Sequence, residues 1–536
     1  MKTKNGITGD TGNPHSQSTK KGIIIMKKTT AWILALLMIL AAAAGCSQKT
    51  ANADVPSETQ PSASDVLSGT EEETAAQDER LDSGLPEADW GGATFTVYIQ
   101  DTGGKGTSAE VFTNDFEAEE LNGEPINDAE YQRVITVQDR GNCVFRPIVV
   151  FAGTADGYKQ IATSVQAGTN DYDLACISAY ASCNALVNGI LMDLRQVPNL
   201  DLSKPWWDQY CIEECTFKDS VFQMTGDISI GDNKATLCYF FNKNMAADYG
   251  MPNFYDMVND HTWTIDNFRG YAEAVDSNLD YDNDGNHTND KDDVYGIYIW
   301  DDIMMGIVNA AGIKCCTINK DGQLELTLYS DKFVEAFDKF TAYAYNKDVT
   351  CAYQRAGSDQ DWGQIAFREG RALFFLQFIG AATAFRDMAD DFGILPLPLF
   401  EENQDWYYSS AASFSLGLYN IPRNSYGEDD YARVGWITEM LAYESMYTLT
   451  PAYYEQTLQN KVSRDEDSAR MLDLILATRT YDFGWYFQIG GYNEGIMNLL
   501  RSYSSDVSSM YKKSEKMATK TIERNNAKIA EQINGN

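Results

Sequence analysis

Strand-like and helix-like segments alternate twice along this chain, and that order constrains its fold more than any other feature. Residues 94–98 alternate polar and apolar side chains as a half-buried strand does. Helix, strand, helix and strand patterns follow in turn over residues 128–139, 145–151, 155–165 and 173–177. A second series of the same kind starts at Leu237. Alternation of this type builds parallel sheets covered by helices, so the sequence predicts two α/β lobes.

The C-terminal part of the chain is predicted to be helical. Residues 433–476 follow a helical pattern, and residues 508–533 form an amphipathic helix. With 536 residues, 44% of them hydrophobic, the chain can bury a large core. The sequence therefore predicts an ordered protein with C-terminal helices added to its lobes.

The net charge of −36 limits what the protein can bind. A nucleic-acid-binding protein neutralises phosphates with Lys and Arg, and no basic stretch of that kind stands out. Long-range attraction of anionic substrates is also disfavoured by this charge. We expect a partner other than nucleic acid.

The N-terminal segment has the pattern of a bacterial lipoprotein signal peptide. Lys27 and Lys28 precede an apolar run over residues 31–44, which is shorter than the ~20 residues a spanning helix needs. The small residues before Cys46 resemble a lipobox, whose cysteine carries diacylglycerol and palmitate chains. We expect a non-native leader over residues 1–25, a signal peptide over residues 26–45 and a lipid anchor at Cys46. A plain secretory signal is the alternative.

Residues 46–89 are rich in Ser, Thr, Ala, Pro, Asp and Glu, which predicts a disordered acidic linker. Beyond Cys46 nine cysteines remain, mostly in apolar surroundings. Such cysteines behave as small buried hydrophobes, so we expect them to be mostly reduced. No spacing typical of a zinc site accompanies them.

An acidic loop resembles the start of an EF-hand calcium site. Asp280, Asp282 and Asp284 occupy alternate positions before Gly285, where a sharp turn is needed. Position 12 of the loop, where an EF-hand has a glutamate ligand, is Lys291. If the loop has a two-residue insertion after Gly285, the aspartates around Lys291 would complete the set of calcium ligands. We expect a structural Ca²⁺ ion, with these ligands: Asp280, Asp282, Asp284, Asp290 and Asp293. The alternative is a solvated acidic turn without metal.

Several segments together resemble the extracellular solute-binding proteins of family 1, the carbohydrate type that serves ABC transporters. They are, in order, KQIATSVQAGTNDYDLACI (159–177), CYFFNKNMAADYGMP (238–252), FREGRALFF (367–375), DFGILPLP (391–398) and PAYYEQTLQNKVSRDEDSARMLDLI (451–475). The resemblance covers about residues 90–510. It implies a periplasmic-binding-protein-like α/β fold with two lobes, a hinge and a ligand cleft between the lobes. Residues 90–230 and 360–405 would form lobe 1, and residues 231–359 and 406–536 lobe 2.

The resemblance also implies a function: binding a sugar or oligosaccharide and delivering it to the permease subunits, as a lipid-anchored monomer on the outer face of the membrane. Ligands bind beyond the carboxyl ends of strands in open α/β sheets. The candidate ligand-binding residues are the polar and aromatic side chains at strand ends and crossings: Gln100, Asp101, Ser178, Tyr180, Asp227, Trp300, Gln377, Phe378, Trp485 and Tyr486. For any single aromatic residue, core packing is the competing interpretation.

Catalytic motifs are missing from the sequence. It has three histidines and no nucleophile elbow, zinc helix or P-loop. We therefore expect no enzymatic activity. Two alternatives stay open: a lipid-anchored glycoside hydrolase, which needs only two carboxylates, and a surface glycan-binding protein without a transporter.

Overall fold

The computed structural model describes residues 80–103, 115–116, 118–275, 292–303, 305–355, 357–358, 361–459 and 466–534. The predicted leader, the signal peptide, Cys46 and the linker up to residue 79 lie outside the described residues. So do four of the five expected calcium ligands, namely Asp280, Asp282, Asp284 and Asp290. The folded part is one unit from Leu85 onward.

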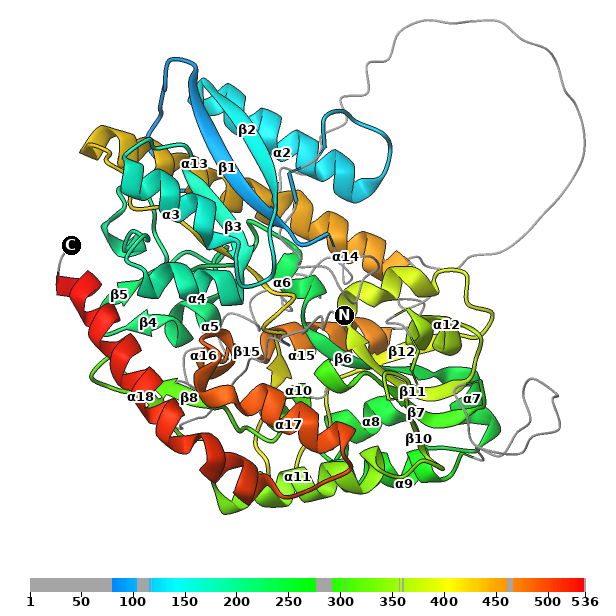
Figure 1. The fold of residues 1–536 in the computed structure, drawn as a ribbon. Helices are drawn as coiled ribbons and strands as arrows, with labels where there is room; N and C mark the ends of the chain where they lie inside the picture. Colours follow the sequence, from blue (N-terminus) through cyan, green and yellow to red (C-terminus); the bar gives the residue numbers. More distant parts are fainter. Residues whose placement is uncertain are drawn as a thin grey trace, which may run out of the picture. The chain divides into compact units, whose positions relative to one another are not determined.

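The first sheet has the strand order β14-β3-β1-β2, and Figure 1 labels its strands β1, β2 and β3. Strands β1 (Ala93–Asp101), β2 (Cys143–Phe151) and β3 (Leu174–Ser178) are parallel, and β14 (Gly417–Asn420) is antiparallel to β3. Four helices accompany these strands: α2 (Pro125–Gly141), α3 (Tyr158–Ala167), α4 (Ala179–Val187) and α13 (Glu428–Tyr447). The predicted alternation over residues 94–177 is confirmed.

The second sheet has the order β10-β7-β11-β6-β12. Strands β10 (Thr350–Ala352), β7 (Tyr295–Ile299) and β11 (Ala372–Phe378) are parallel. Strand β6 (Leu237–Asn242) is antiparallel to both β11 and β12 (Phe392–Leu395). Its helices are α7 (Lys243–Asp248), α8 (Phe254–Asn259), α9 (Ile265–Glu273), α11 (Asp331–Ala344), α12 (Trp362–Arg368) and α15 (Glu466–Ala477).

Aromatic side chains form the core on both faces of the second sheet. On one face, the Phe374 ring centroid lies 5.7 Å from that of Trp263 and 4.8 Å from that of Phe268. On the other face, Phe375 packs on Phe367 at 5.7 Å. Because neighbouring strand residues point to opposite faces, this apolar run is buried between two layers of helices.

The strand pairing corrects the predicted lobe boundaries. Residues 360–405 were expected in the first lobe, but β11 and β12 pair with β6 and lie in the second sheet. The return to the first sheet comes later, at β14 and α13. Fully buried strands all have similar runs of apolar residues in sequence. Only their backbone hydrogen bonds show which sheet each strand joins.

Two segments cross between the sheets side by side. Met224 forms a β-bridge with Tyr419, and Thr236 forms one with Ala411. The segment 224–236, which includes α6 (Gly231–Lys234), therefore runs antiparallel to the segment 411–419. A third passage lies at Thr448, where α13 ends and α14 (Leu449–Gln459) begins.

The remaining helices and strands are short, apart from two near the C-terminus. The helices are α5 (Gln209–Glu214), α10 (Met305–Ala310), α16 (Phe483–Tyr486), α17 (Tyr492–Arg501) and α18 (Val507–Asn534). The strand pairs are β4 (Thr216–Phe217) with β5 (Ser220–Val221), β8 (Cys316–Ile318) with β9 (Leu324–Leu326), and β13 (Ser409–Ser410) with β15 (Arg479–Thr480). The 3₁₀ helices are η1 (Leu194–Gln196), η2 (Asp301–Ile303), η3 (Ile379–Phe385) and η5 (Ile489–Gly491).

The nine described cysteines are buried and unbridged. The sulfur atoms of Cys211 and Cys215 lie 3.4 Å apart. Burial raises the pKa of the Cys211 thiol well above its ordinary value, which keeps the thiol protonated. Among the helices of the described residues, we find none with the length and apolar content to cross a bilayer.

A glycine in α13 tests how closely that helix packs on the first lobe. A Cβ at Gly435 would overlap the backbone carbonyl oxygen of Pro198, so Gly435→Ala should destabilise the protein by about 1–3 kcal/mol. Gly270, inside α9, has open space around it, so Gly270→Ala should instead stabilise by about 0.5–1 kcal/mol. Urea unfolding of both variants checks the pair, and a stable Gly435→Ala protein would contradict the packing.

Candidate functional site

The end of β3 meets the second crossing segment at Tyr180. This residue is the second of α4, which directly follows β3, and it is 8% exposed. Its hydroxyl lies 3.1 Å from Ser413 Oγ, and Asn493 Nδ2 of α17 donates to it at 3.4 Å. Burial raises the pKa of Tyr180, so the hydroxyl keeps its proton. One phenol therefore joins a first-sheet strand end, a crossing segment and a C-terminal helix.

A small cavity of about 30 Å³ lies beside this cluster. It has room for about one water molecule. Its polar lining residues are Asp302, Asn309, Ser410, Ser413 and Asn493. Its apolar lining residues are Leu237, Ile303, Met305, Phe414 and Trp485. Asp302 follows β7, and Leu237 is paired with Phe378 at the last residue of β11. The cavity thus lies at the carboxyl ends of the parallel strands of the second sheet.

Three donors hold the Asp302 carboxylate in place. Arg501 of α17 donates at 2.5 Å, the Trp300 indole at 3.3 Å and the Gln354 amide at 3.4 Å. The three donors come from the ends of β7 and β10 and from α17, so the acceptor is fixed from several sides. An oriented carboxylate of this kind can accept hydrogen bonds from ligand hydroxyls.

The neighbouring carboxylate of Asp301 is fully buried and pairs with Arg355 at 3.1 Å. Burial raises the pKa of Asp301, and the Arg355 charge opposes that rise. The Arg355 guanidinium also lies 4.9 Å from the centroid of the Tyr503 ring. The Asp301–Arg355 ion pair therefore helps to fix the loop that follows β7.

A second network supports the polar side of the cavity. Ser410 Oγ donates to Asn309 Oδ1 at 2.9 Å, and Asn309 Nδ2 donates to Asp482 Oδ2 at 3.2 Å. Asp482 also accepts the backbone N–H of Cys315 at 3.1 Å. Burial raises the pKa of Asp482 to about 7. The hydrogen bonds that fix Asn309 and Ser410 in the cavity wall therefore depend on a carboxyl group whose pKa lies near neutrality.

Four of the ten sequence-derived ligand candidates lie around this cavity. Trp485 lines it, Tyr180 bonds to the lining residues Ser413 and Asn493, Trp300 binds Asp302, and the Phe378 ring packs 5.8 Å from that of Phe414. Tyr486 lies buried close by, and its hydroxyl donates to Ala411 O at 3.4 Å. The choice of polar and aromatic residues at strand ends therefore identified residues of both sheets that lie close together.

The other candidates lie elsewhere in the described structure. The Gln100 amide donates to Gly153 O at 2.9 Å and accepts from Ser178 N at 2.9 Å, which ties two loops together. Ser178 caps α4. Asp101 is exposed and accepts from Gly103 N. Gln377 is buried in β11, and its Oε1 accepts from the next backbone N–H.

Asp227 belongs to the first crossing segment. It accepts a hydrogen bond from Thr450 at 2.7 Å. Burial raises its pKa to about 7, and the nearby Asp232 charge adds to that rise. Asp227 is not among the residues that line the cavity.

The sequence argument missed Asp302, Asn309, Ser413 and Asn493. The rule that found Trp300 would have found Asp302, since both follow β7. Ser413 lies in the crossing segment 411–419. Asn493 carries no comparable signal, because α17 reaches the cavity from far along the chain.

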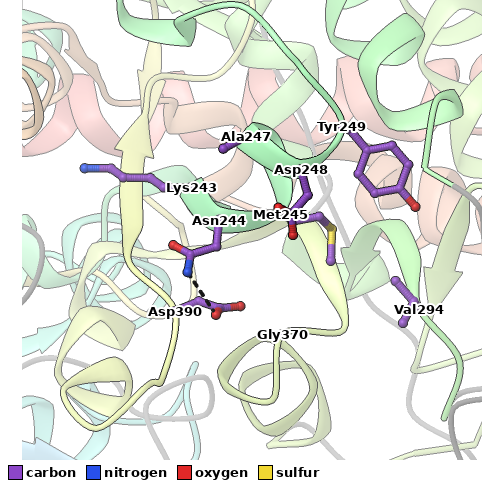
Figure 2. Close-up of a pocket in the computed structure, with 9 residues that line it drawn as sticks. All are labelled: Lys243, Asn244, Met245, Ala247, Asp248, Tyr249, Val294, Gly370 and Asp390. Atoms are coloured by element: carbon purple, nitrogen blue, oxygen red, sulfur yellow. Dashed lines mark hydrogen bonds between the residues drawn. The ribbon is translucent and has the colours of Figure 1, made fainter.

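A larger hollow of about 550 Å³ lies at the other end of the second sheet. Figure 2 shows Asn244 and Asp390 facing one another across part of it, with a hydrogen bond of 3.3 Å. Lys243 directly follows β6, and Gly370 precedes β11. These are the amino ends of the parallel strands, so the smaller cavity is the better ligand candidate.

Of the expected calcium ligands, Asp293 is described. It is 6% exposed and lies just before β7, where its backbone oxygen accepts from the Tyr298 hydroxyl at 2.9 Å. No group of three or more His, Cys, Asp or Glu residues suited to a metal ion occurs in the part of the chain that the structure describes.

Solved structures of low sequence identity have a similar fold. A cyclo/maltodextrin-binding protein solved with maltotetraose is 13% identical, over 80% of this chain and 96% of its own, with a TM-score of 0.50. UspC of M. tuberculosis is 15% identical over 80% and 100%, with a TM-score of 0.52. An ABC transporter solute-binding protein of Thermotoga lettingae, bound with α-D-tagatose, is 13% identical over 81% and 100%, with a TM-score of 0.50. No protein-family model and no curated protein sequence matches the chain.

The raised pKa of Asp482 predicts a pH dependence of stability. The folded pKa of about 7 lies above the ordinary 3.8, so the folded state binds this proton more tightly than the unfolded state does. The stabilisation that this bound proton gives the folded state is fully present below pH 4 and is lost as the pH rises through 7. Relative to Asp482→Asn, the wild type should lose on the order of 1 kcal/mol per pH unit in that window.

Urea unfolding of both proteins from pH 4 to 8 measures this difference. Other buried carboxyl groups titrate in both proteins and cancel. A stability difference that is constant with pH would show that Asp482 does not titrate in the folded protein.

Proposed function

We propose that this chain, which has the two-lobed fold of the carbohydrate-type ABC solute-binding proteins, is a lipid-anchored extracellular receptor that binds a sugar or oligosaccharide and delivers it to a permease. The observation that carries the proposal is the cluster of Tyr180, Ser413 and Asn493. It joins the carboxyl end of one sheet to elements beside the carboxyl end of the other. Solved neighbours of this fold carry maltotetraose and tagatose.

The chemistry of the cavity suits a neutral polyhydroxylated ligand. Asp302 can accept from hydroxyl groups, while Ser413 and Asn493 can both donate and accept. The Trp485 indole offers an apolar face for the C–H side of a sugar ring. Arg501 is engaged by Asp302, which disfavours an anionic ligand.

Ligand entry requires the lobes to move apart. A cavity of about 30 Å³ is too small for a sugar, and its polar lining groups already form hydrogen bonds within the protein. The crossing segments 224–236 and 411–419 lie side by side, so rotation about them can open the cleft as a hinge. Tyr180, Ser413 and Asn493 would then exchange their mutual hydrogen bonds for bonds to the ligand.

The alternative to a receptor is an enzyme that hydrolyses a glycan. A glycoside hydrolase places two carboxylates on either side of the scissile bond. Among the described residues that line the cavity, Asp302 is the one carboxylate, and an arginine holds it. The arrangement favours binding without covalent chemistry.

A sugar panel tests the receptor function. A ligand at ~100 times its dissociation constant should add about 2.7 kcal/mol to the unfolding free energy of the protein, which gives a thermal shift of a few degrees. The ligand should be recovered intact. A cleaved ligand would support the hydrolase, and no shift with any sugar would remove support for a carbohydrate receptor.

Substitutions at the cavity test the site. Tyr180→Phe removes the hydroxyl and should weaken binding by about 3- to 10-fold, the value of one or two neutral hydrogen bonds. Trp485→Ala should weaken it further. Trp406→Ala is the matched control, because Trp406 is 41% exposed and is not a lining residue. Equal affinities in all three variants would place the ligand elsewhere.

We also propose a structural Ca²⁺ site in the loop that leads to Asp293. The support is the spacing of Asp280, Asp282 and Asp284 before Gly285. Millimolar calcium should raise the melting temperature of the protein, and Asp282→Asn should abolish that rise. A melting temperature unaffected by calcium or by a chelator would contradict the site.

A further inference from the structure

The solvent-facing side of α18 carries a cluster of positive charge on an acidic protein. Six basic and three acidic residues give α18 a net charge of +3, in a chain whose net charge is −36. All six basic side chains are exposed: Lys512, Lys513, Lys516, Lys520, Arg524 and Lys528. We call this the basic face of α18.

The helical period places the basic face opposite the buried side of α18. The buried side is formed by Ala518, Ile522, Asn525 and Ile529, among others. At 100° per residue, the six cations centre on the opposite direction, and they extend over about 24 Å of helix. Figure 1 shows α18 as a long continuous helix at the end of the chain.

The cations of the basic face are only partly balanced by nearby carboxylates. None of the six forms an ion pair with an acidic side chain among the described residues, although hydrogen bonds from Ser509 and the charge of Lys512 lower the pKa of Asp506, which directly precedes α18. Lys528 donates to the backbone oxygen of Val187 at 3.1 Å, and Arg524 contacts the amide oxygen of Asn525. Their charge is therefore available to an anionic partner.

One exposed apolar side chain lies among these cations. Met517 lies between them on the outward side and is 55% exposed. Tyr329, which is 39% exposed near the start of α18, instead stacks on Tyr511 at the buried side of the helix, with the ring centroids 4.8 Å apart. Lysines beside an exposed apolar side chain are typical of surfaces that rest on a lipid headgroup layer.

We propose that the basic face of α18 docks on the anionic headgroups of a lipid bilayer and so orients the protein on it. Each Lys or Arg near such a surface adds about 1 kcal/mol of attraction, while the remaining acidic surface is repelled. The basic face is therefore the side that can approach the bilayer. A flat layer of phosphates can also contact cations distributed along a straight helix at the same time.

The acidic residues of the chain's own segment 54–79 are the competing occupant. That segment has eight acidic residues and no basic one. It could match the charge of the basic face, but its Ser, Thr, Ala and Pro residues offer little to Met517. A bilayer matches both the charge and this exposed apolar side chain. The proposal goes beyond solute binding and does not depend on which solute is bound.

Co-sedimentation with vesicles tests the docking. The protein is residues 46–536 with Cys46→Ser, which lacks acyl chains and contains the folded unit from Leu85 onward. Vesicles contain phosphatidylcholine alone or with about 30% phosphatidylglycerol. We expect binding to the anionic vesicles alone, with an affinity that falls steeply as salt rises, because salt screens surface charge.

Two charge-matched variants locate the contact. The first variant combines Lys512→Gln, Lys516→Gln and Lys520→Gln. Glutamine is a good helix former, so α18 should stay helical. The loss of three positive charges should weaken vesicle binding about tenfold or more. The control substitutes Gln for the exposed residues Lys159, Arg195 and Arg386, which lie outside α18, and should change binding less than twofold. Circular dichroism confirms that both variants fold.

Three results would overturn the proposal. The first is equal binding to neutral vesicles, and the second is an equal loss in both variants. The third is binding by residues 85–536 but not by residues 46–536, which would assign the basic face to the acidic N-terminal segment.

Discussion

The arrangement of the crossing segments depends on one buried arginine. Arg479 in β15 donates to Asp208 at the start of α5 at 2.8 Å and to Asn233 of α6 at 2.6 Å, and it pairs with Asp232 at 3.1 Å. Although burial alone would lower the pKa of Arg479, the charges of Asp232 and Asp208 raise it well above its ordinary value. Removing either carboxylate would leave a buried charge partly unpaired, which is strongly destabilising. This group of ion pairs fixes α5, α6 and β15 together where the chain passes between the sheets.

The candidate site lies a short distance along the chain from this cluster. Strand β15 pairs with β13, whose Ser410 lines the cavity, and is followed by Asp482, which supports Asn309. In the proposed opening of the cleft, this charged anchor would stay intact. The hydroxyl and amide contacts of Tyr180 are neutral and few, so they can exchange for ligand contacts at modest cost. A fixed anchor beside exchangeable contacts is consistent with the receptor function proposed above.

Sequence reasoning predicted the α/β class, both series of strands and the C-terminal helices, because hydrophobic periodicity depends on local burial. It also brought Tyr180, Trp300, Phe378 and Trp485 to one cavity, since the carboxyl ends of parallel strands meet at one edge of a sheet. It assigned β11 and β12 to the wrong lobe, because a buried apolar strand carries no mark of its neighbours. Asn493 was missed for a related reason, as its contact with Tyr180 spans 313 residues of chain.

The sequence by itself determined the alternation of strands and helices, the acidic charge and the burial of the cysteines. Each of these follows from the composition and spacing of neighbouring residues. Only the tertiary structure decided which strands share a sheet, that Arg479 joins three elements, and that α18 presents its basic residues to solvent. Those outcomes depend on hydrogen bonds and packing between residues far apart in the chain, and periodicity carries no information about such pairs.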